Sequence, residues 1–185
     1  MRLFLGCPLD ADTARKVAAW AEEELKGLPV KLVPAENLHA TTLFFGEVDE
    51  ETAALLSHAT GLVGWQPMRA EAKALKLYGK TALSLALDAP IDPLQVELRG
   101  DAETPLSRMA SLLHAMRPRE NRPLDLHVTI ARARGAIDSR RLPPPPRIHA
   151  SLDSLVLYRS HLSQRGAHYE RLAESQVQDP SFRTS

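Results

Sequence analysis

The spacing of apolar residues changes several times along the chain, and each change predicts a new element. Apolar residues at helical spacing follow Asp10, a favourable N-cap, and predict one helix, while acidic residues before another apolar stretch favour a second. Short runs rich in β-branched and aromatic residues predict strands. The first half is therefore predicted to contain a strand over 2–7, a helix over 10–25, a strand over 30–48, a helix over 49–64, and strands over 70–79 and 81–89 joined by a turn at Gly79 and Lys80.

The second half shows the same mixture of periods. Thr104 and Pro105 begin a helical pattern that Pro118 is expected to end. Residues 93–101 fit either a strand or a helical turn, so both readings stay open. We predict strands over 126–132, 149–159 and 167–174, a loop over 160–166, and a stiff extended connector at the four prolines 143–146. This order of helices and strands predicts the α+β class, with residues 1–185 as a single domain.

Composition is that of a folded globular protein, with 44% hydrophobic and 25% charged residues among 185. No window approaches the roughly 18 to 20 apolar residues that cross a bilayer, and the first residues do not resemble a secretory signal. The single Cys7 lies in the first apolar run and is interpreted as a small buried hydrophobe. We therefore expect a cytoplasmic protein that does not enter a membrane.

Charge is distributed unevenly although the formal net charge is zero. Residues 1–98 carry 9 basic and 14 acidic side chains, whereas residues 99–185 carry 14 Arg, no Lys and 9 acidic side chains. The planar guanidinium group donates paired hydrogen bonds that suit phosphate. The second half is therefore predicted to face a polyanion, with a simple surface bias as the alternative.

Two His-x-Thr segments stand inside apolar runs that are predicted as strands. His39 and Thr41 lie in NLHATTLFFG, and His127 and Thr129 lie in DLHVTIARARG. Side chains two apart on a strand point to the same face, so each His lies beside its Thr. If the two strands are close, two imidazoles and two hydroxyls converge. One such segment arises readily by chance, but two in matching strand contexts favour a shared site.

This set of groups suits the chemistry of a phosphodiester. Histidine can act as an acid or as a base near neutral pH, and in-line cleavage of a P–O bond needs one of each. Hydroxyl groups at Thr41 and Thr129 can donate to the non-bridging phosphate oxygens, where charge accumulates. The arrangement requires no metal, and the sequence contains no cluster of ligands at metal-binding spacing.

The other histidines have weaker claims to a site. His58 and His114 fall on predicted helices, where solvated or structural roles are expected. His149 and His168 lie near the C-terminal strands. His161 follows Ser160 in the predicted loop and precedes Arg165, and these three residues are candidates for the mouth of the site.

The two motifs resemble those of the 2H phosphoesterase superfamily, and within it the RNA 2′,3′-cyclic phosphodiesterases, also called 2′-5′ RNA ligases. Segment 39–46 is similar to the first family motif and segment 127–132 to the second. Further similarity covers RLFLGCPL, PAENLH and SLVLYRSHLSQRGAHYERL, and so nearly the whole chain. Thr42, Phe45 and Ile130 each stand where the family usually has Leu, and Leu43 fills the variable position, so no candidate catalytic group is removed.

The resemblance implies a bilobal α+β fold with two antiparallel-rich sheets, outer helices and a central cleft. It implies hydrolysis of RNA 2′,3′-cyclic phosphate ends, or of cyclic mononucleotides, to a 2′-phosphate, with possible reverse 2′-5′ ligation and no cofactor. It implies that His39 is the proton donor and His127 the proton acceptor, that Arg132 binds phosphate with Thr41 and Thr129, and that Phe44 stacks on a base. A monomer is expected from the zero net charge and the lack of an obvious exposed apolar helix face.

Strand geometry raises an objection to two of these roles. Phe44 and Arg132 each lie five residues after their histidine, an odd offset that directs a side chain to the opposite face. A β-bulge or the end of the strand would return them to the histidine face.

Two other functions stay open at this point. The first is a 2H relative that acts on another cyclic phosphate or 2′-5′ linked nucleotide, such as an ADP-ribose cyclic phosphate or an oligoadenylate. The second is a protein that binds RNA ends through Arg–phosphate contacts without catalysis.

Overall fold

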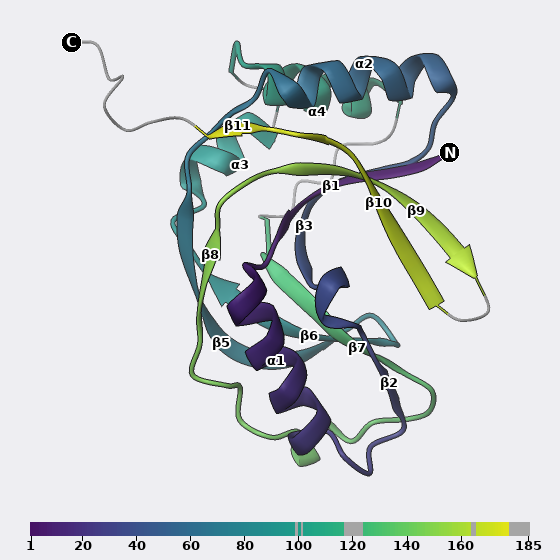
Figure 1. The fold of residues 1–185 in the computed structure, drawn as a ribbon, viewed down its shortest axis with the longest axis vertical. Coiled ribbons are helices and arrows are strands. Elements are labelled where there is room, and N and C mark those ends of the chain that lie inside the picture. The colour runs from purple at the N-terminus through teal and green to yellow at the C-terminus, as the bar shows by residue number, and fades with distance from the viewer. Residues whose placement is uncertain (99, 101, 117–123, 164–165, 178–185) are drawn as a thin grey trace.

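The protein has an α+β fold in which helices cover one face of a strongly curled, largely antiparallel sheet (Figure 1). The computed structural model describes residues 1–98, 100, 102–116, 124–163 and 166–177. The helices are α1 (Ala11–Glu24), α2 (Glu50–Gly61), α3 (Asp92–Leu98) and α4 (Pro105–Met116), with short 3₁₀ turns η1 (Ala35–Asn37) and η2 (Ser139–Arg141). The strands are β1 (Arg2–Pro8), β2 (Val30–Leu32), β3 (His39–Glu47), β4 (Gly64–Trp65), β5 (Met68–Tyr78), β6 (Ala82–Asp88), β7 (His127–Ala133), β8 (His149–Leu152), β9 (Val156–Ser163), β10 (Gly166–Glu174) and β11 (Gln176–Val177).

The strands form a large sheet and a small sheet of β4 and β11. The large sheet has the strand order β10-β9-β1-β3-β7-β6-β5-β8, and β2 pairs with β7. At its centre, β3 and β7 share a single registered pair, Ala40 with Val128. The two predicted sheets are therefore two halves of one curled sheet that meet at this pair. The prediction of an α+β fold with antiparallel sheets and outer helices is confirmed.

One face of the sheet and the inner sides of the helices form the hydrophobic core. The sheet contributes residues such as Leu3, Leu5 and Leu85, and α1 contributes Val17 and Ala21, all of them buried in one cluster. Helix α1 lies over the β5–β8 half, and α2 and α4 lie at the other end of the molecule (Figure 1). None of the four described helices therefore covers the opposite face of the sheet at the β3–β7 junction.

The helix predictions agree with the structure because their local signals are strong. The Asp10 carboxylate accepts a hydrogen bond from the Thr13 amide at 2.9 Å, as expected of an N-cap. Residues 93–101, left open from the sequence, contain most of α3, and Pro93 is accepted in its first turn because no amide is needed there. Pro118 lies outside the described residues. No helix in the described part of the chain has the length and apolar character needed to cross a membrane.

Two strand predictions and one loop prediction were wrong in their limits. The strand predicted over 30–48 is divided into β2, η1 and β3, because Pro34 has no amide to donate and begins a 3₁₀ turn. The strand over 149–159 is divided at 153–155, where the Leu155 amide donates to Ser175 Oγ at 2.9 Å. The predicted loop over 160–166 belongs mostly to strands, because β9 continues to Ser163 and β10 begins at Gly166.

Candidate active site

The two His-x-Thr segments lie on adjacent strands at the centre of the sheet. Ala40 and Val128 form the pair that joins β3 to β7, and both side chains are buried in the core. The residues that flank a buried strand position point to the other face. His39 and Thr41 therefore share that face with His127 and Thr129. Antiparallel pairing at this point places each histidine beside the threonine of the other motif.

A β-bulge in β3 returns Phe44 to the histidine face. Thr42 and Leu43 are both buried, whereas strict alternation would bury only one of them, and the register with β1 shifts at this position. Phe44 is 40% exposed and is the cross-strand partner of Phe4, whose ring stacks on His39 at 4.8 Å between centroids. Cross-strand partners share a face, so Phe44 lies on the side of His39.

A matching bulge in β7 does the same for Arg132. Ile130 and Ala131 are both buried, and the register with β6 shifts at the same distance after the histidine as in β3. Arg132 is exposed and is close enough to His39 for its charge to lower the pKa of that imidazole. The geometric objection to Phe44 and Arg132 is therefore answered by bulges at equivalent positions of the two motifs.

Both imidazoles are held in the same tautomer by a backbone carbonyl two residues earlier. Nδ1 of His39 lies 2.7 Å from the Asn37 carbonyl oxygen, and Nδ1 of His127 lies 2.7 Å from the Asp125 carbonyl oxygen. A carbonyl oxygen only accepts, so each Nδ1 must carry the hydrogen. Each Nε2 is then free to accept a proton when the ring is neutral or to donate one when it is charged.

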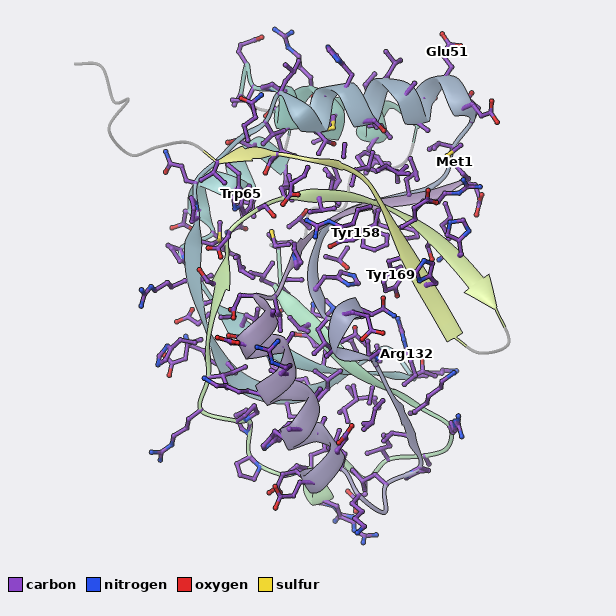
Figure 2. The ribbon with its side chains drawn as sticks, in the orientation of Figure 1. Met1, Glu51, Trp65, Arg132, Tyr158 and Tyr169 are labelled. Atoms are coloured by element: carbon purple, nitrogen blue, oxygen red, sulfur yellow. The ribbon has the colours of Figure 1, made fainter. Side chains whose placement is uncertain are left out.

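His39 is enclosed by aromatic rings. Besides Phe4, Tyr169 meets it edge-on at 5.0 Å and Tyr158 lies at 5.7 Å between centroids. Figure 2 labels both tyrosines on the β9–β10 hairpin and Arg132 at the far end of β7. Gly6 lies under the ring, and a Cβ there would be only 3.1 Å from His39 Cδ2. A side chain at position 6 would therefore crowd the imidazole and the Ala40 carbonyl, and one of them would have to move slightly.

This enclosure controls the charge of His39. Burial disfavours the imidazolium and lowers its pKa to about 4, with smaller contributions in the same direction from the charges of Arg132 and His127, while the Asn37 carbonyl acts in the opposite direction. His39 is therefore neutral at neutral pH without a ligand. A proton donor must be charged before it acts, so the donor role of His39 stays a prediction that requires a ligand to raise this pKa.

We expect NMR titration of the imidazole signals to show His39 titrating well below the usual histidine range, near pH 4. Inorganic phosphate or a nucleoside 2′-phosphate should raise the pKa, because a nearby negative charge favours the protonated ring. The exposed His58 provides an internal control that phosphate should not affect. An unchanged His39 pKa with saturating phosphate would mean that the anion does not bind beside this ring.

Thr129 is held by a neighbour that sequence analysis did not identify. The buried Ser84 hydroxyl of β6 donates to Thr129 Oγ1 at 3.1 Å, and the two residues are cross-strand partners. Thr129 Oγ1 accepts this hydrogen bond, so its own hydrogen remains available for a ligand.

The remaining candidate residues that the structure describes lie on different faces of the β9–β10 hairpin or on other elements. His161 pairs with His168 on the hairpin and binds the Glu170 carboxylate at 2.8 Å, on the face opposite to Tyr158 and Tyr169. It therefore points away from His39, which argues against its candidate place at the mouth of the site. Ser160 is the cross-strand partner of Tyr169 and shares its face. Arg165 lies outside the described residues. His58 and His114 lie on α2 and α4, and His149 lies on β8.

Within the described ranges, no three His, Cys, Asp or Glu side chains are grouped so that they could hold a metal ion. The side chains that share the face of the two histidines carry hydroxyl, guanidinium and aromatic groups. These groups suit a ligand that combines an anionic phosphate with a planar base, such as a nucleotide.

Comparisons with known proteins agree with this geometry. An RNA 2′,3′-cyclic phosphodiesterase of Archaeoglobus fulgidus is 30% identical over 139 residues, covering 72% of this chain and 73% of the relative. The chain belongs to the 2H phosphoesterase family. A second relative of the same name, from Methanocaldococcus jannaschii, is 26% identical and covers 94% of this chain and 99% of its own. No protein-family model matches the chain.

Solved structures share the 2H phosphoesterase fold. A crystal structure of a phosphoesterase has a TM-score of 0.75 at 23% identity, covering 96% of this chain and 98% of its own. E. coli LigT in complex with 3′-AMP has a TM-score of 0.73 at 23% identity, with the same coverage. The family membership supports a phosphodiesterase as the class of enzyme, and the predicted fold family is confirmed.

Proposed function

We propose that this 2H phosphoesterase hydrolyses RNA 2′,3′-cyclic phosphate ends to 2′-phosphates by a two-histidine acid–base mechanism. The observation that carries the proposal is the pair of His-x-Thr segments on one face of adjacent strands, with both Nδ1 atoms bonded to carbonyls and both Nε2 atoms available. The names of the relatives from Archaeoglobus fulgidus and Methanocaldococcus jannaschii support the substrate class.

In the proposed reaction, water attacks phosphorus while the bond from phosphorus to the 3′ oxygen breaks. His127 Nε2 takes a proton from the water, and His39 Nε2 gives a proton to the leaving 3′ oxygen. The product is a 2′-phosphate with a free 3′ hydroxyl, and the two imidazoles exchange their protons with solvent before the next turnover. The negative charge of the bound phosphate would raise the pKa of His39 and so charge the donor.

The other groups on this face would bind the substrate. The Thr41 and Thr129 hydroxyls would donate to the non-bridging oxygens, and Arg132 would add a charge-assisted contact to phosphate. Phe44 would stack on the base next to the cyclic phosphate, a contact that any base can make. If a 5′ hydroxyl took the place of water, the same step would form a 2′-5′ linkage, which gives the proposed ligation without ATP.

The expected cytoplasmic location, monomeric state and independence from metal and cofactor belong to the proposal. An activity on an ADP-ribose cyclic phosphate or an oligoadenylate is the alternative substrate class. All of these ligands present a phosphodiester to the same two histidines, so only direct comparison of substrates separates them.

The test is to incubate the purified protein with 2′,3′-cyclic AMP in EDTA and to assign the product by phosphorus NMR. A 2′-phosphate as the sole product is expected. A 3′-phosphate would reverse the leaving oxygen and overturn the proposed roles. Absence of turnover, both here and with a short RNA that has the same end, would overturn the proposed function, and parallel assays of the alternative substrates would then identify another activity.

A further inference from the structure

The two histidines are anchored in the same way by the residue two positions earlier. The motifs read Asn37-Leu-His39 and Asp125-Leu-His127, and the carbonyl of the first residue accepts from the imidazole in each case. In each motif the side chain of that first residue also makes a hydrogen bond to another strand, and the strand differs between the two motifs. Asn37 Nδ2 donates to the Ala167 carbonyl of β10 at 3.1 Å, and the Asp125 carboxylate accepts from the Tyr78 hydroxyl of β5 at 2.9 Å.

Tyr78 has a second contact with the same group. Its ring stacks on the His127 imidazole with centroids 3.9 Å apart and an angle of 9° between the planes. Three connections therefore form a closed loop: ring stacking from Tyr78 to His127, the hydrogen bond from His127 to the Asp125 carbonyl, and the hydrogen bond from Tyr78 to the Asp125 carboxylate. Burial, together with the hydrogen bond and charge of Asp125, raises the pKa of Tyr78, so its hydroxyl stays a donor.

The surroundings of His39 show why this loop matters for His127. His39 is held on several sides by Phe4, Tyr158, Tyr169 and the backbone at Gly6. The side chains of Tyr78 and His127 are only half-buried, and Asp125 is exposed. Without the Tyr78 ring and the Asp125 link, His127 has fewer contacts to prevent rotation about its side-chain bonds.

We propose that Tyr78 and Asp125 are positioning residues that hold His127 in one tautomer and one orientation, with Nε2 directed at the substrate. This role deepens the proposed function and rests on His127 being a catalytic group. A rotated ring would direct Nε2 away from the substrate, and the other tautomer would carry its hydrogen on Nε2, which then cannot accept a proton. In either case the loss would appear in kcat more than in KM.

The test compares Tyr78→Phe, Tyr78→Leu and Asp125→Ala with the parent protein, using kcat and KM for 2′,3′-cyclic AMP. Tyr78→Phe keeps the stacked ring and loses one hydrogen bond, so a decrease in kcat of about tenfold or less is expected. Tyr78→Leu loses both contacts, and a decrease on the order of 10²-fold is expected. The control is Lys73→Ala, an exposed residue of the same strand that pairs with Asp88, and it should keep the parent kcat.

A double-mutant cycle tests the link between the two residues. Because Tyr78→Phe and Asp125→Ala remove the same hydrogen bond, the double variant should lose little more kcat than the larger of the two single losses. Independent multiplication of the two losses would show that Asp125 acts on His127 by another route, such as its charge, and would overturn its role as a partner of Tyr78.

Heteronuclear NMR of the imidazole nitrogens provides a measurement that does not depend on turnover. The free parent protein should show His127 protonated at Nδ1, and Tyr78→Leu should show a mixture of both tautomers while the remaining spectrum stays that of a folded protein. A single unchanged tautomer in a folded Tyr78→Leu variant, or unchanged kcat in that variant, would overturn the proposal. If the parent protein shows no turnover, the proposed function fails, whereas the tautomer result still decides whether Tyr78 positions the ring.

Discussion

His39→Ala and His127→Ala will each lower kcat for a 2′,3′-cyclic phosphate by about 10²–10⁴-fold, the range expected for loss of a general acid or base. The two Nε2 atoms lie on the same face of β3 and β7, and each is the free nitrogen of a ring whose Nδ1 is bonded to a carbonyl. Initial rates with 2′,3′-cyclic AMP measure the effect. The double variant should lose less than the product of the two single losses, because the two groups act in one step.

A matched control is His58→Ala, an exposed histidine of α2, which should keep the parent rate. A substrate with sulfur in place of the 3′ oxygen then separates the two roles, because a thiolate leaves without being protonated. The variant that lacks the proton donor should recover much of its rate on this substrate, and the variant that lacks the acceptor should not. Recovery by His127→Ala instead of His39→Ala would reverse the assignment, and near-parent activity of either variant on the ordinary substrate would rule out the two-histidine mechanism.

Thr41→Val and Thr129→Val will each lower kcat by on the order of 10²-fold, comparable to the loss of one oxyanion-hole donor. Valine keeps the branched shape that suits a strand and removes only the hydroxyl. The hydroxyls face the side of the histidines, and Thr129 is already oriented by Ser84. If the hydrogen bonds form mainly in the transition state, KM should change little, and steady-state kinetics with 2′,3′-cyclic AMP separates the two parameters.

Thr42→Val is the matched control for these variants. Its hydroxyl is buried and donates to the Leu5 carbonyl at 3.3 Å, on the core side of the same strand. The change should leave kcat near the parent value and lower the free energy of unfolding by about 1 kcal/mol, the usual cost of one buried hydrogen bond. A fall in kcat equal to that of Thr41→Val would indicate that general disturbance of β3, and not loss of a phosphate contact, explains the effect.

Two β-bulges at equivalent positions of β3 and β7 bring an additional side chain to the face of the histidines. Each is placed after a His-x-Thr segment, and each is followed by an exposed side chain, Phe44 in one motif and Arg132 in the other. One half of the site thus presents an aromatic ring and the other a cation from the same backbone geometry. The Arg2 guanidinium lies 4.9 Å from the centroid of the Phe44 ring, which adds a positive charge beside the predicted base position.

Local patterns in the sequence determined much of this protein. The N-cap at Asp10, the first-turn acids of α2 and the helical period of α4 are signals within a few residues, and the corresponding helices agree with them. The side-chain period of a strand was enough to place His39 with Thr41 and His127 with Thr129. Because the period of two is a property of the backbone itself, these pairings required no knowledge of the neighbouring strands.

The tertiary structure alone decided which residues join these pairs and how the two histidines differ. A bulge is defined by the register with a partner strand, so the face of Phe44 and Arg132 depended on β1 and β6. Tyr78 is separated from His127 by 49 positions in the chain, and no local pattern links them. Burial also depends on distant segments. Rings from β1, β9 and β10 enclose His39, and burial lowers its pKa, whereas among the described residues His127 meets one ring, that of Tyr78 in β5. The repeated motif thus predicts two equal histidines, and the curled sheet gives them unequal surroundings because strands from opposite ends of the chain pack on each side.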